Sequence, residues 1–321
     1  MTDIIFKNAQ ISNLLVEQHF HGCFGINFSN CSVDDVVFVA RKILQYGIGG
    51  IFPTLVTDDV ENIKRQIKII KKASENLPED AAKILGIHLE GIFINPLKKG
   101  IHDETKLLEL TVKNYKLIED NFIKIVTLAP ELDKGLQKYL KRKGVKVQAG
   151  HCVGGDLSCC DGVTHTFNAM EGVSHKKDTT ALSALTENLY AEIIADGVHV
   201  NKKALDLFFK MKSKNKILLI SDCLPVTKSD LKQVSFAGKE IYYDGKKATS
   251  KDGVLAGSTM LLTDIVRKLS LENPEKFSTY VAMASLNQYK YHKIKLNGKV
   301  WWDGKFNILA VEKDGIVLCK K

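Results

Sequence analysis

The sequence contains histidine and carboxylate residues whose types and spacing could hold a divalent metal ion. His19 and His21 lie two positions apart, and alternate residues of a strand project from the same face, so both imidazoles can point at one ion. A His-x-His pair alone is weak evidence, because paired histidines also occur on surfaces and in cores. The prediction therefore depends on further candidates, each at the end of an apolar, strand-like run: Glu90, His151, His165, His199 and Asp222.

These ligand types indicate a particular chemistry. Imidazole and carboxylate ligands without a thiolate suit Zn²⁺, and also Fe²⁺, Mn²⁺ or Co²⁺. A cation held in this way makes water acidic enough to supply hydroxide near neutral pH for attack on a carbonyl carbon. Asp222 could take the proton from that water and return it to a leaving group. Its local sequence is equally compatible with a helix N-cap, and only the accompanying histidines favour the catalytic interpretation.

Strand-like and helical patterns alternate along the chain and would bring these side chains to one end of a barrel. Strands are predicted at 11–16, 50–55, 83–89, 123–128, 145–149, 162–164, 189–195 and 216–221. Helices are predicted from Ser32 to Gly47, at 62–73, near 105–118 and at 134–143. This alternation predicts a (β/α)₈ barrel, an α/β fold whose catalytic groups come from the C-terminal ends of the strands.

The two ends of the chain are predicted to form a small β appendage. Strand-like pieces occur at 4–6 and again at 300–302, 306–311 and 316–318, with a turn at 313–315. We therefore expect residues 1–13 and 296–321 to form the appendage and residues 14–295 to form the barrel. Within the latter range, strand-like pieces at 234–243 and helices at 261–269 and 274–286 follow the eighth barrel strand.

The amino-acid composition indicates what kind of molecule the protein binds and where it works. With 46 basic and 37 acidic residues the formal net charge is +9, which suits an anionic substrate. The lysines fall in helical segments without interleaved aromatic residues, so no nucleic-acid partner is expected. No run of 18 apolar residues indicates a membrane span, and no leader pattern begins the sequence. The seven cysteines form no Cys-x-x-Cys pair, which indicates reduced thiols and a cytoplasmic protein.

Several short segments occur in a fixed order along the chain. They are His19-Phe20-His21, His88-Leu89-Glu90-Gly91, 126–131, Gly150-His151, 164–170, 195–200, Ser221-Asp222 and 255–258. With these segments the chain resembles the N-acetylglucosamine-6-phosphate deacetylase family of the amidohydrolase superfamily. The patterns Thr-His-x-Phe-Asn-Ala-Met and Leu-Ala-Gly-Ser are distinctive for that family among its relatives.

The resemblance implies roles for individual residues. Glu90, His151 and His165 would hold the main metal, His19 and His21 would extend the site to a second ion bridged by Glu90, and Asp222 would be the catalytic acid and base. One or two ions per subunit are therefore expected. Contact with substrate is implied for Ile101, His102, Asn168, Ala169, Asp196, Gly197, Val198, His199, Leu255, Ala256 and Gly257. His102 would also polarise the acetyl carbonyl.

The chain departs from the family pattern in places. Ile92 stands where the family commonly has proline. Lys176 stands where the family has a phosphate-binding arginine, and lysine keeps the charge but loses the bidentate fork. The segment before His19 is short for the family, so a reduced β-sandwich is expected. His88 shares a strand face with Glu90 and is interpreted either as a residue supporting the ligands or as a structural histidine.

By resemblance, the expected reaction is hydrolysis of the acetamide of N-acetylglucosamine 6-phosphate, giving glucosamine 6-phosphate and acetate in amino-sugar catabolism, by a homodimer. Deacetylation of N-acetylgalactosamine 6-phosphate remains an alternative, as does another amidohydrolase reaction. Some of these relatives bridge their metals with a carboxylated lysine on the fourth strand; Lys124 lies there, but Glu90 already supplies a bridge. A non-catalytic barrel is disfavoured because the full set of ligands is present.

Overall fold

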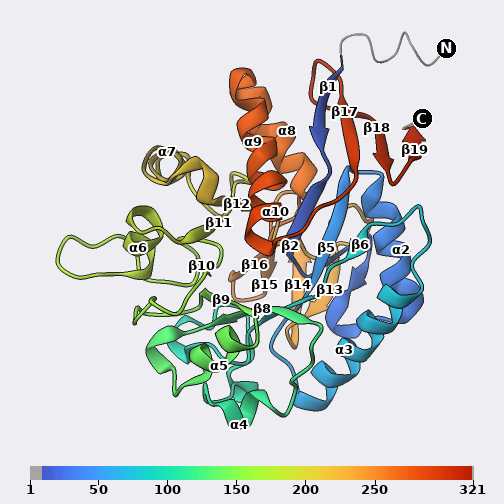
Figure 1. The fold of residues 1–321 in the computed structure, drawn as a ribbon. Helices are drawn as coiled ribbons and strands as arrows, with labels where there is room; N and C mark the ends of the chain where they lie inside the picture. Colours follow the sequence, from blue (N-terminus) through green and yellow to red (C-terminus); the bar gives the residue numbers. More distant parts are fainter. Residues whose placement is uncertain (1–8, 320–321) are drawn as a thin grey trace.

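The computed structural model describes residues 9–319, and its centre is a barrel of eight parallel strands (Figure 1). In the order in which they are hydrogen-bonded, these are β2 (Leu15–Phe20), β5 (Ile48–Leu55), β7 (Ile87–Glu90), β8 (Ile123–Leu128), β9 (Lys146–Ala149), β10 (Gly162–Val163), β11 (Tyr190–Ile194) and β12 (Ile217–Ile220). The short strand β6 (Lys83–Ile84) also pairs with β5, so the predicted strand 83–89 is divided in two. The predicted barrel is confirmed.

The barrel closes where its first and last strands meet. The Asp222 N–H donates to the His19 carbonyl at 2.8 Å, and the His21 N–H donates to the Cys223 carbonyl at 2.9 Å. These bonds join the C-terminal ends of β2 and β12. Closure therefore brings residues near the two ends of the barrel sequence into direct contact.

Helices cover the outside of the barrel (Figure 1). They are α2 (Val33–Leu44), α3 (Val60–Glu75), α4 (Val112–Tyr115), α5 (Leu136–Arg142), α6 (Thr180–Thr186), α7 (Lys202–Met211), α8 (Leu262–Glu272), α9 (Phe277–Ala284) and α10 (Leu286–His292). As the sequence indicates, α2 begins with a capping box, in which Ser32 and Asp35 each bond to the other's backbone N–H. Within residues 9–319, no helix has both the length and the apolar character needed to cross a bilayer.

The predicted helix at 105–118 is wrong over most of its length. Only a single 3₁₀ turn at Glu104–Lys106 and the four-residue helix α4 form there. The Leu108 N–H donates to the Ile92 carbonyl at 2.7 Å, so this part of the backbone is bonded to the loop after β7. Thr111 then starts a new turn, because its side chain accepts the Asn114 N–H. Long-range bonding has overridden a local helical pattern.

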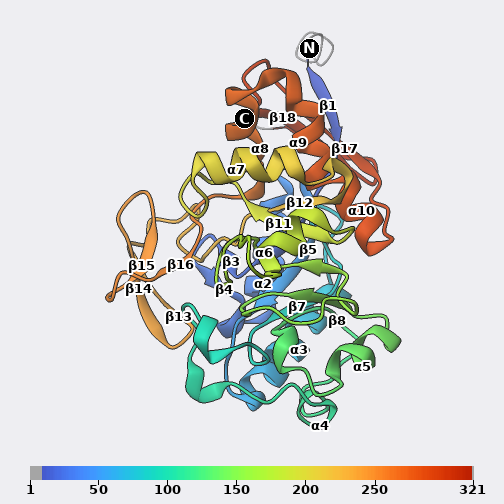
Figure 2. The ribbon, with the colours of Figure 1, turned by 90° about the vertical axis from the view of Figure 1, so that its left-hand side faces the viewer.

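Antiparallel sheets flank the barrel. One contains β1 (Gln10–Asn13), β17 (Gly298–Trp302), β18 (Ile308–Lys313) and β19 (Ile316–Cys319), and Figure 1 shows the N-terminal strand β1 beside the C-terminal strand β17. Another contains β13 (Gln233–Phe236), β14 (Lys239–Tyr243), β15 (Ala248–Ser250) and β16 (Leu255–Gly257), and it projects from one side of the barrel in Figure 2. The strand predicted at 4–6 lies outside the described residues, and the division of the chain at 13 and 296 stays a prediction.

The barrel interior is held by hydrogen-bonded polar side chains as well as by apolar packing. His88 Nε2 lies 2.8 Å from Thr127 Oγ1, which lies 2.7 Å from Thr164 Oγ1, and Thr164 donates to Gln148 at 2.9 Å. The other ring nitrogen of His88 lies 3.0 Å from the Gln18 carbonyl. Buried polar groups that satisfy one another in this way fix the strands in register directly beneath the predicted ligands.

Candidate metal centre and active site

A pocket of about 260 Å³ opens at the C-terminal ends of the barrel strands. Most of the predicted site residues line it: His21, Glu90, Ile101, His102, His151, His165, Asn168, Ala169, His199, Asp222, Leu255, Ala256 and Gly257. Residues from seven loops or strand ends, up to 236 positions apart in the sequence numbering, thus face one small volume. Phe236, the last residue of β13, also lines the pocket and was not predicted.

The possible ligands among the described residues form three groups, two of which share Glu90, while the third joins His19 to His88 and Glu192. In one group, Oε1 of Glu90 lies 2.9 Å from His165 Nε2 and 3.3 Å from His151 Nε2. In the other group, Oε2 of Glu90 lies 3.0 Å from His21 Nε2, while His19 Nε2 is 3.3 Å from Oε1. Glu90 Oε1 thus contacts histidines of both groups and Oε2 faces His21, so the Glu90 carboxylate lies between the two groups.

Asp222 belongs to the second group. Its Oδ1 atom lies 3.2 Å from His21 Nε2 and 3.5 Å from His19 Nε2. Instead of capping a helix, Asp222 follows β12 in a left-handed conformation, and its N–H is bonded to the His19 carbonyl. The N-cap interpretation of Asp222 is therefore wrong, and its carboxylate faces the cluster.

The electrostatics of the cluster favour a cation. Burial alone would raise the pKa of Glu90, but the facing imidazoles of His19, His151 and His165 hold that pKa well below its usual value. Burial alone would lower the pKa of His19, but Glu90 and other nearby carboxylates raise it well above its usual value. Two buried atoms that face the cluster, His19 Nε2 and Asp222 Oδ1, have no hydrogen-bond partner among the described residues. The donor set therefore fits a divalent metal ion.

Two of the histidines are oriented through their other ring nitrogen. His151 Nδ1 donates to the Lys98 carbonyl at 2.8 Å, which leaves Nε2 to face Glu90. His19 Nδ1 lies 3.0 Å from Oε2 of Glu192, so its Nε2 faces the same cluster. Ligating histidines commonly donate their second nitrogen to a carboxylate or a carbonyl, and this contact sets the tautomer.

Glu192 is a site residue that reasoning from the sequence missed. It lies in the middle of β11, is completely buried, and also accepts the backbone N–H of His165 at 3.1 Å. A signal was present in the sequence: Glu192 is an acidic residue within the otherwise apolar run Ala191 to Ala195. A carboxylate is almost never buried in a strand unless it is paired.

His102 has a defined tautomer. Its Nδ1 atom lies 2.7 Å from Thr57 Oγ1, and the same hydroxyl oxygen accepts the Ile92 N–H at 2.8 Å. The Thr57 hydroxyl hydrogen is satisfied only if it is donated to Nδ1, so the ring proton of neutral His102 lies on Nε2. That atom is 3.8 Å from Glu90 Oε2 and faces the pocket. Burial and the nearby His151 hold the pKa of His102 well below its usual value, so the ring stays neutral.

Gly91 explains why this loop can approach so closely. A Cβ atom at Gly91 would lie 2.2 Å from Thr57 Oγ1 and 2.7 Å from His102 Nδ1, and its φ is +106°. Any other residue would displace the hydroxyl that orients His102.

The backbone is strained at several strand ends of the site. His151, His165, Ala169 and Asp222 have φ values of +50°, +27°, +48° and +51°. Each such conformation in a residue with a Cβ atom costs about 1–3 kcal/mol and persists only where the surrounding contacts enforce it. These four are among twelve described non-glycine residues with positive φ, and the other eight do not line the pocket.

Some predicted substrate contacts lie outside this pocket. Asp196, Gly197 and Val198 line a neighbouring cavity, whereas His199 lines the metal pocket. Asp196 holds this turn, because its carboxylate accepts the N–H groups of Val198 and His199 and lies 2.8 Å from His199 Nδ1. Lys176 is exposed in the loop between β10 and α6 and does not line the pocket.

The β13–β16 sheet supplies the remaining wall. Leu255, Ala256 and Gly257 come from β16, and the ring of Phe236 lies 4.9 Å from the His21 ring. A Cβ atom at Gly257 would lie 2.8 Å from the Asp222 carbonyl, so glycine lets this strand pass beside the residue that faces the cluster. The sheet thus adds apolar surface to a pocket whose floor is polar.

Comparison with curated proteins identifies sequence relatives. The N-acetylglucosamine-6-phosphate deacetylase of Bos taurus is 30% identical over 278 residues, which are 78% of this chain and 67% of that protein. The enzyme of the same name from Bacillus subtilis is 27% identical over 79% of this chain and 68% of its own length. The N-acetylgalactosamine-6-phosphate deacetylase of Escherichia coli is 28% identical over 79% of this chain and 70% of its own length. No protein-family model matches the sequence.

Solved structures show the same fold. The N-acetylglucosamine-6-phosphate deacetylase of Pasteurella multocida superimposes with a TM-score of 0.89 at 22% identity, covering 97% of this chain and 87% of that one. A structure of the Mycobacterium smegmatis enzyme in complex with N-acetyl-D-glucosamine-6-phosphate gives a TM-score of 0.86 at 23% identity, over 97% and 87% of the two chains.

Proposed function

Because the chain belongs to the N-acetylglucosamine-6-phosphate deacetylase family of the amidohydrolase superfamily, we propose that it hydrolyses the acetamide of N-acetylglucosamine 6-phosphate. The products are glucosamine 6-phosphate and acetate, and the reaction serves amino-sugar catabolism. One observation carries the proposal at the site itself: two groups of ligand-type side chains share Glu90 at the base of a pocket that Asp222 and His102 also face.

The metal would be held by the two groups around Glu90, with Zn²⁺ the ion that best suits this donor set. Glu90, His151 and His165 would hold the first ion, and His19, His21 and Asp222 would join Glu90 around a second. A bound cation would supply Lewis acidity, which polarises the acetamide carbonyl and lowers the pKa of water.

Asp222 moves the proton in this proposal. Its Oδ1 atom is buried, lacks a hydrogen-bond partner and faces the cluster, so it can accept a proton from the attacking water. The same carboxyl group then donates that proton to the amide nitrogen as the C–N bond breaks, and glucosamine 6-phosphate leaves as an amine. The tight turn enforced by Gly257 and by the N–H bond to His19 keeps the carboxylate in place.

His102 stabilises the developing negative charge on the carbonyl oxygen. The Thr57 hydroxyl keeps its proton on Nε2, the atom that faces the pocket, so the ring can donate a hydrogen bond to that oxygen. A neutral ring that donates one hydrogen bond leaves the general acid-base role to Asp222.

Substrate recognition is proposed to divide between polar and apolar parts of the pocket. The Ala169 N–H and His199 are suited to phosphate oxygens, and Asn168 lies beside them, although its amide nitrogen also donates to the His165 carbonyl at 3.2 Å. Leu255 and Ala256 are suited to the acetyl methyl group. No lysine or arginine of the described residues lines this pocket, so Lys176 would have to reach the phosphate by movement of its loop or from another subunit.

N-Acetylgalactosamine 6-phosphate is the second candidate substrate, because one relative of similar identity is named for it. The deciding experiment measures acetate release from both hexosamine 6-phosphates, with the protein as purified and after chelation. We expect faster turnover of the gluco epimer and loss of activity after chelation, with recovery on adding Zn²⁺. Absence of acetate release from either epimer by the metal-loaded protein would refute the proposal.

We further propose a cytoplasmic homodimer. All seven cysteines are unpaired, in keeping with a reducing compartment. Leu207 and Met211 of α7 and Val173 of the loop between β10 and α6 are large apolar side chains that are about half exposed, and they offer surface for a second copy. Light scattering during gel filtration measures the mass of the assembly.

A further inference from the structure

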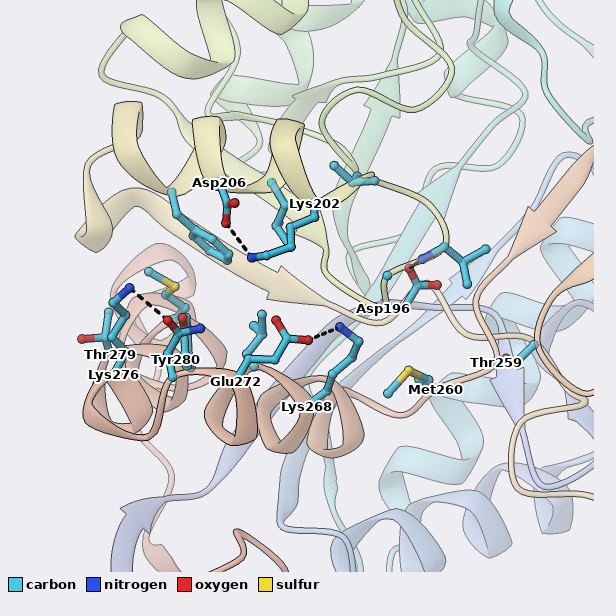
Figure 3. A pocket seen from close by; sticks show the side chains of 18 of the residues that line it. Asp196, Lys202, Asp206, Thr259, Met260, Lys268, Glu272, Lys276, Thr279 and Tyr280 are labelled. Atoms are coloured by element: carbon cyan, nitrogen blue, oxygen red, sulfur yellow. Dashed lines mark hydrogen bonds and ion pairs between the residues drawn. The ribbon is translucent and has the colours of Figure 1, made fainter.

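A large cavity lies outside the barrel, between α7 and α8. Its volume is about 910 Å³, compared with about 260 Å³ for the metal pocket. Figure 3 shows α7 forming one wall with Lys202 and Asp206, and α8 forming the other with Lys268 and Glu272. A volume of this size is typical of a site for a small organic molecule. Of its lining residues, the deacetylase chemistry described above uses only Asp196, which holds His199.

The inner part of this cavity is apolar and partly aromatic. Leu205, Leu269, Tyr280 and Met283 are buried and line it. Phe209 of α7 completes this surface, and its ring centroid lies 5.9 Å from that of Tyr280, at an interplanar angle of 54°. The inner part is therefore suited to a flat, apolar or aromatic body.

The rim of the cavity is strongly positive. Six lysines line the cavity, against three carboxylates: Lys202, Lys210, Lys214, Lys246, Lys268 and Lys276, with Asp196, Asp206 and Glu272. Each carboxylate already has a partner, since Asp206 pairs with Lys202 at 3.2 Å, Glu272 with Lys268 at 2.7 Å, and Asp196 with His199.

Three of these lysines lack a compensating charge. No carboxylate of residues 9–319 lies within 4.0 Å of the ammonium groups of Lys210, Lys214 or Lys246. They come from three separate segments, at the end of α7, in the following 3₁₀ turn and in the β14–β15 turn. Lys246 lies at the end of the cavity near Thr259, whose hydroxyl donates to the Lys246 carbonyl at 3.2 Å, whereas Lys210 and Lys214 follow Phe209 at the end near Tyr280. Like charges beside one cleft create a field that attracts an anion, and phosphate is the anion that lysine ammonium groups commonly bind.

The cavity also touches the turn that carries His199. Asp196, Gly197 and Val198 line it, and His199, the next residue, lines the metal pocket. A Cβ atom at Gly197 would lie 3.3 Å from Lys268 Nζ, so the lysine side chain passes directly over this turn. A ligand that drew Lys268 away from Glu272 would act on a wall shared by the two pockets.

From this combination we propose that the cavity between α7 and α8 binds a small phosphorylated compound with an aromatic body, of which a nucleoside diphosphate is the simplest kind. The aromatic part lies against Phe209 and Tyr280, and the phosphates lie beside Lys210 and Lys214 at the same end of the cavity. Binding itself does not depend on the proposed deacetylase function. The expected effect of binding on the turn that carries His199 does rest on the proposed deacetylase function. Binding of the compound and its effect on deacetylation are therefore measured separately.

The test of binding uses the full chain and ADP in isothermal titration calorimetry, with adenosine and inorganic pyrophosphate as the separate parts. We expect ADP to bind with a Kd below about 1 mM and more tightly than either part. Lys210→Glu and Lys214→Glu should each weaken ADP binding about tenfold or more. Lys203→Glu is the matched control, because Lys203 lies on the same helix and does not line the cavity. Its Kd should stay within about twofold of the original value.

A further variant tests whether ADP binding needs the open space of the cavity as well as the charge of its lysines. Thr279→Trp would fill part of the cavity without altering a lysine, and it should abolish binding of ADP. Three results would overturn the proposal: no ADP binding at millimolar concentration, equal binding of ADP and pyrophosphate, or binding insensitive to the changes at Lys210 and Lys214. A fourth result would also overturn the proposal. If the protein is a dimer that never binds ADP and that dissociates in these charge-reversal variants, a second copy of the chain covers the cavity.

The effect on the shared turn is tested with the proposed substrate. Saturating ADP should change the KM for N-acetylglucosamine 6-phosphate severalfold with little change in kcat, and Lys203→Glu should retain this effect. An unchanged KM with ADP bound would show that the two pockets are not coupled. Loss of all acetate release with ADP binding intact would instead refute the deacetylase proposal.

Discussion

The Nδ1 atom of His19 lies 3.0 Å from Oε2 of Glu192, and neither side chain is exposed to solvent. The other carboxylate oxygen of Glu192 accepts a hydrogen bond from Gln18, whose own oxygen lies 2.7 Å from His292 Nε2. His292 of α10, on the outside of the barrel, is thus connected through the two buried side chains of Gln18 and Glu192 to a candidate metal ligand. This contact fixes which nitrogen of His19 faces Glu90.

Glu192→Gln should therefore weaken metal binding without unfolding the protein. Three donors converge on Glu192, from His19, Gln18 and the His165 backbone, and a glutamine amide would turn one of its own donors toward them. We expect metal affinity to fall by about 10–100-fold. Metal content after dialysis, together with the absorption spectrum of the Co²⁺-loaded protein, measures the change. Glu187→Gln, at an exposed glutamate shortly before β11, is the control and should leave both readouts unchanged.

Asp222→Asn should keep the metal and lose turnover. The amide cannot accept and return a proton, and general acid-base groups contribute about 10²–10⁴-fold to rate. The group of Glu90, His151 and His165 is unaltered by the change, so at least one ion should remain bound. Acetate release and metal content are measured on the same preparation, beside Asp230→Asn at an exposed position. Near-normal turnover in the Asp222 variant would remove Asp222 from the proposed mechanism.

Thr57→Val should slow the chemical step by releasing His102 from its tautomer. The valine keeps the volume but cannot donate to Nδ1 or accept the Ile92 N–H. We expect kcat to fall about tenfold with a smaller change in KM, because the lost interaction acts mainly in the transition state. Thr57→Ser retains the hydroxyl and should restore most of the rate. Equal loss in both variants would mean that packing at this position, rather than the hydrogen bond, is responsible.

Removal of the metal should destabilise the fold. Ligands that bind only the native state raise its stability, by about 2.7 kcal/mol when present at a hundredfold excess over Kd. The melting temperature should therefore fall after treatment with EDTA and recover with Zn²⁺. Zinc-saturated EDTA serves as the control and should have no effect. A melting temperature indifferent to both treatments would contradict a metal centre in this cluster.

Lys212 should make stability depend on alkaline pH. It is buried at the end of α7, where its ammonium group donates to the Glu187 carbonyl, and burial together with Lys216 lowers its pKa to about 8. The unfolded chain, with a lysine pKa near 10.5, then holds more protons than the folded chain between these values.

The free energy of unfolding should therefore rise with pH from about 8 to about 10.5, relative to a Lys212→Met variant that cannot titrate. We expect a relative gain on the order of 1 kcal/mol, since partial access of solvent screens the ammonium group. Urea unfolding of both proteins at several pH values measures the difference. A difference that falls with pH would contradict the lowered pKa.

Local patterns sufficed to predict much of this molecule. Apolar runs gave the barrel strands, because a strand buried on both faces needs apolar residues along its length. The capping residues Ser32 and Asp35 gave the start of α2, since both partners of that motif lie within one turn. The positions of Glu90, His151, His165 and Asp222 at strand ends could also be predicted, because strand ends can be located from the sequence.

What the sequence alone determined was therefore the set of elements and the residue types at their ends. Only the tertiary structure decided that Glu192 orients His19 across 173 positions, that Thr57 fixes the proton of His102, and that Lys176 stays outside the pocket. It also broke the predicted helix at 105–118 and divided the 196–199 turn between two cavities. The physical reason is that helix and strand patterns depend on neighbours within a few residues, whereas these contacts exist only after barrel closure sets the register of distant strands.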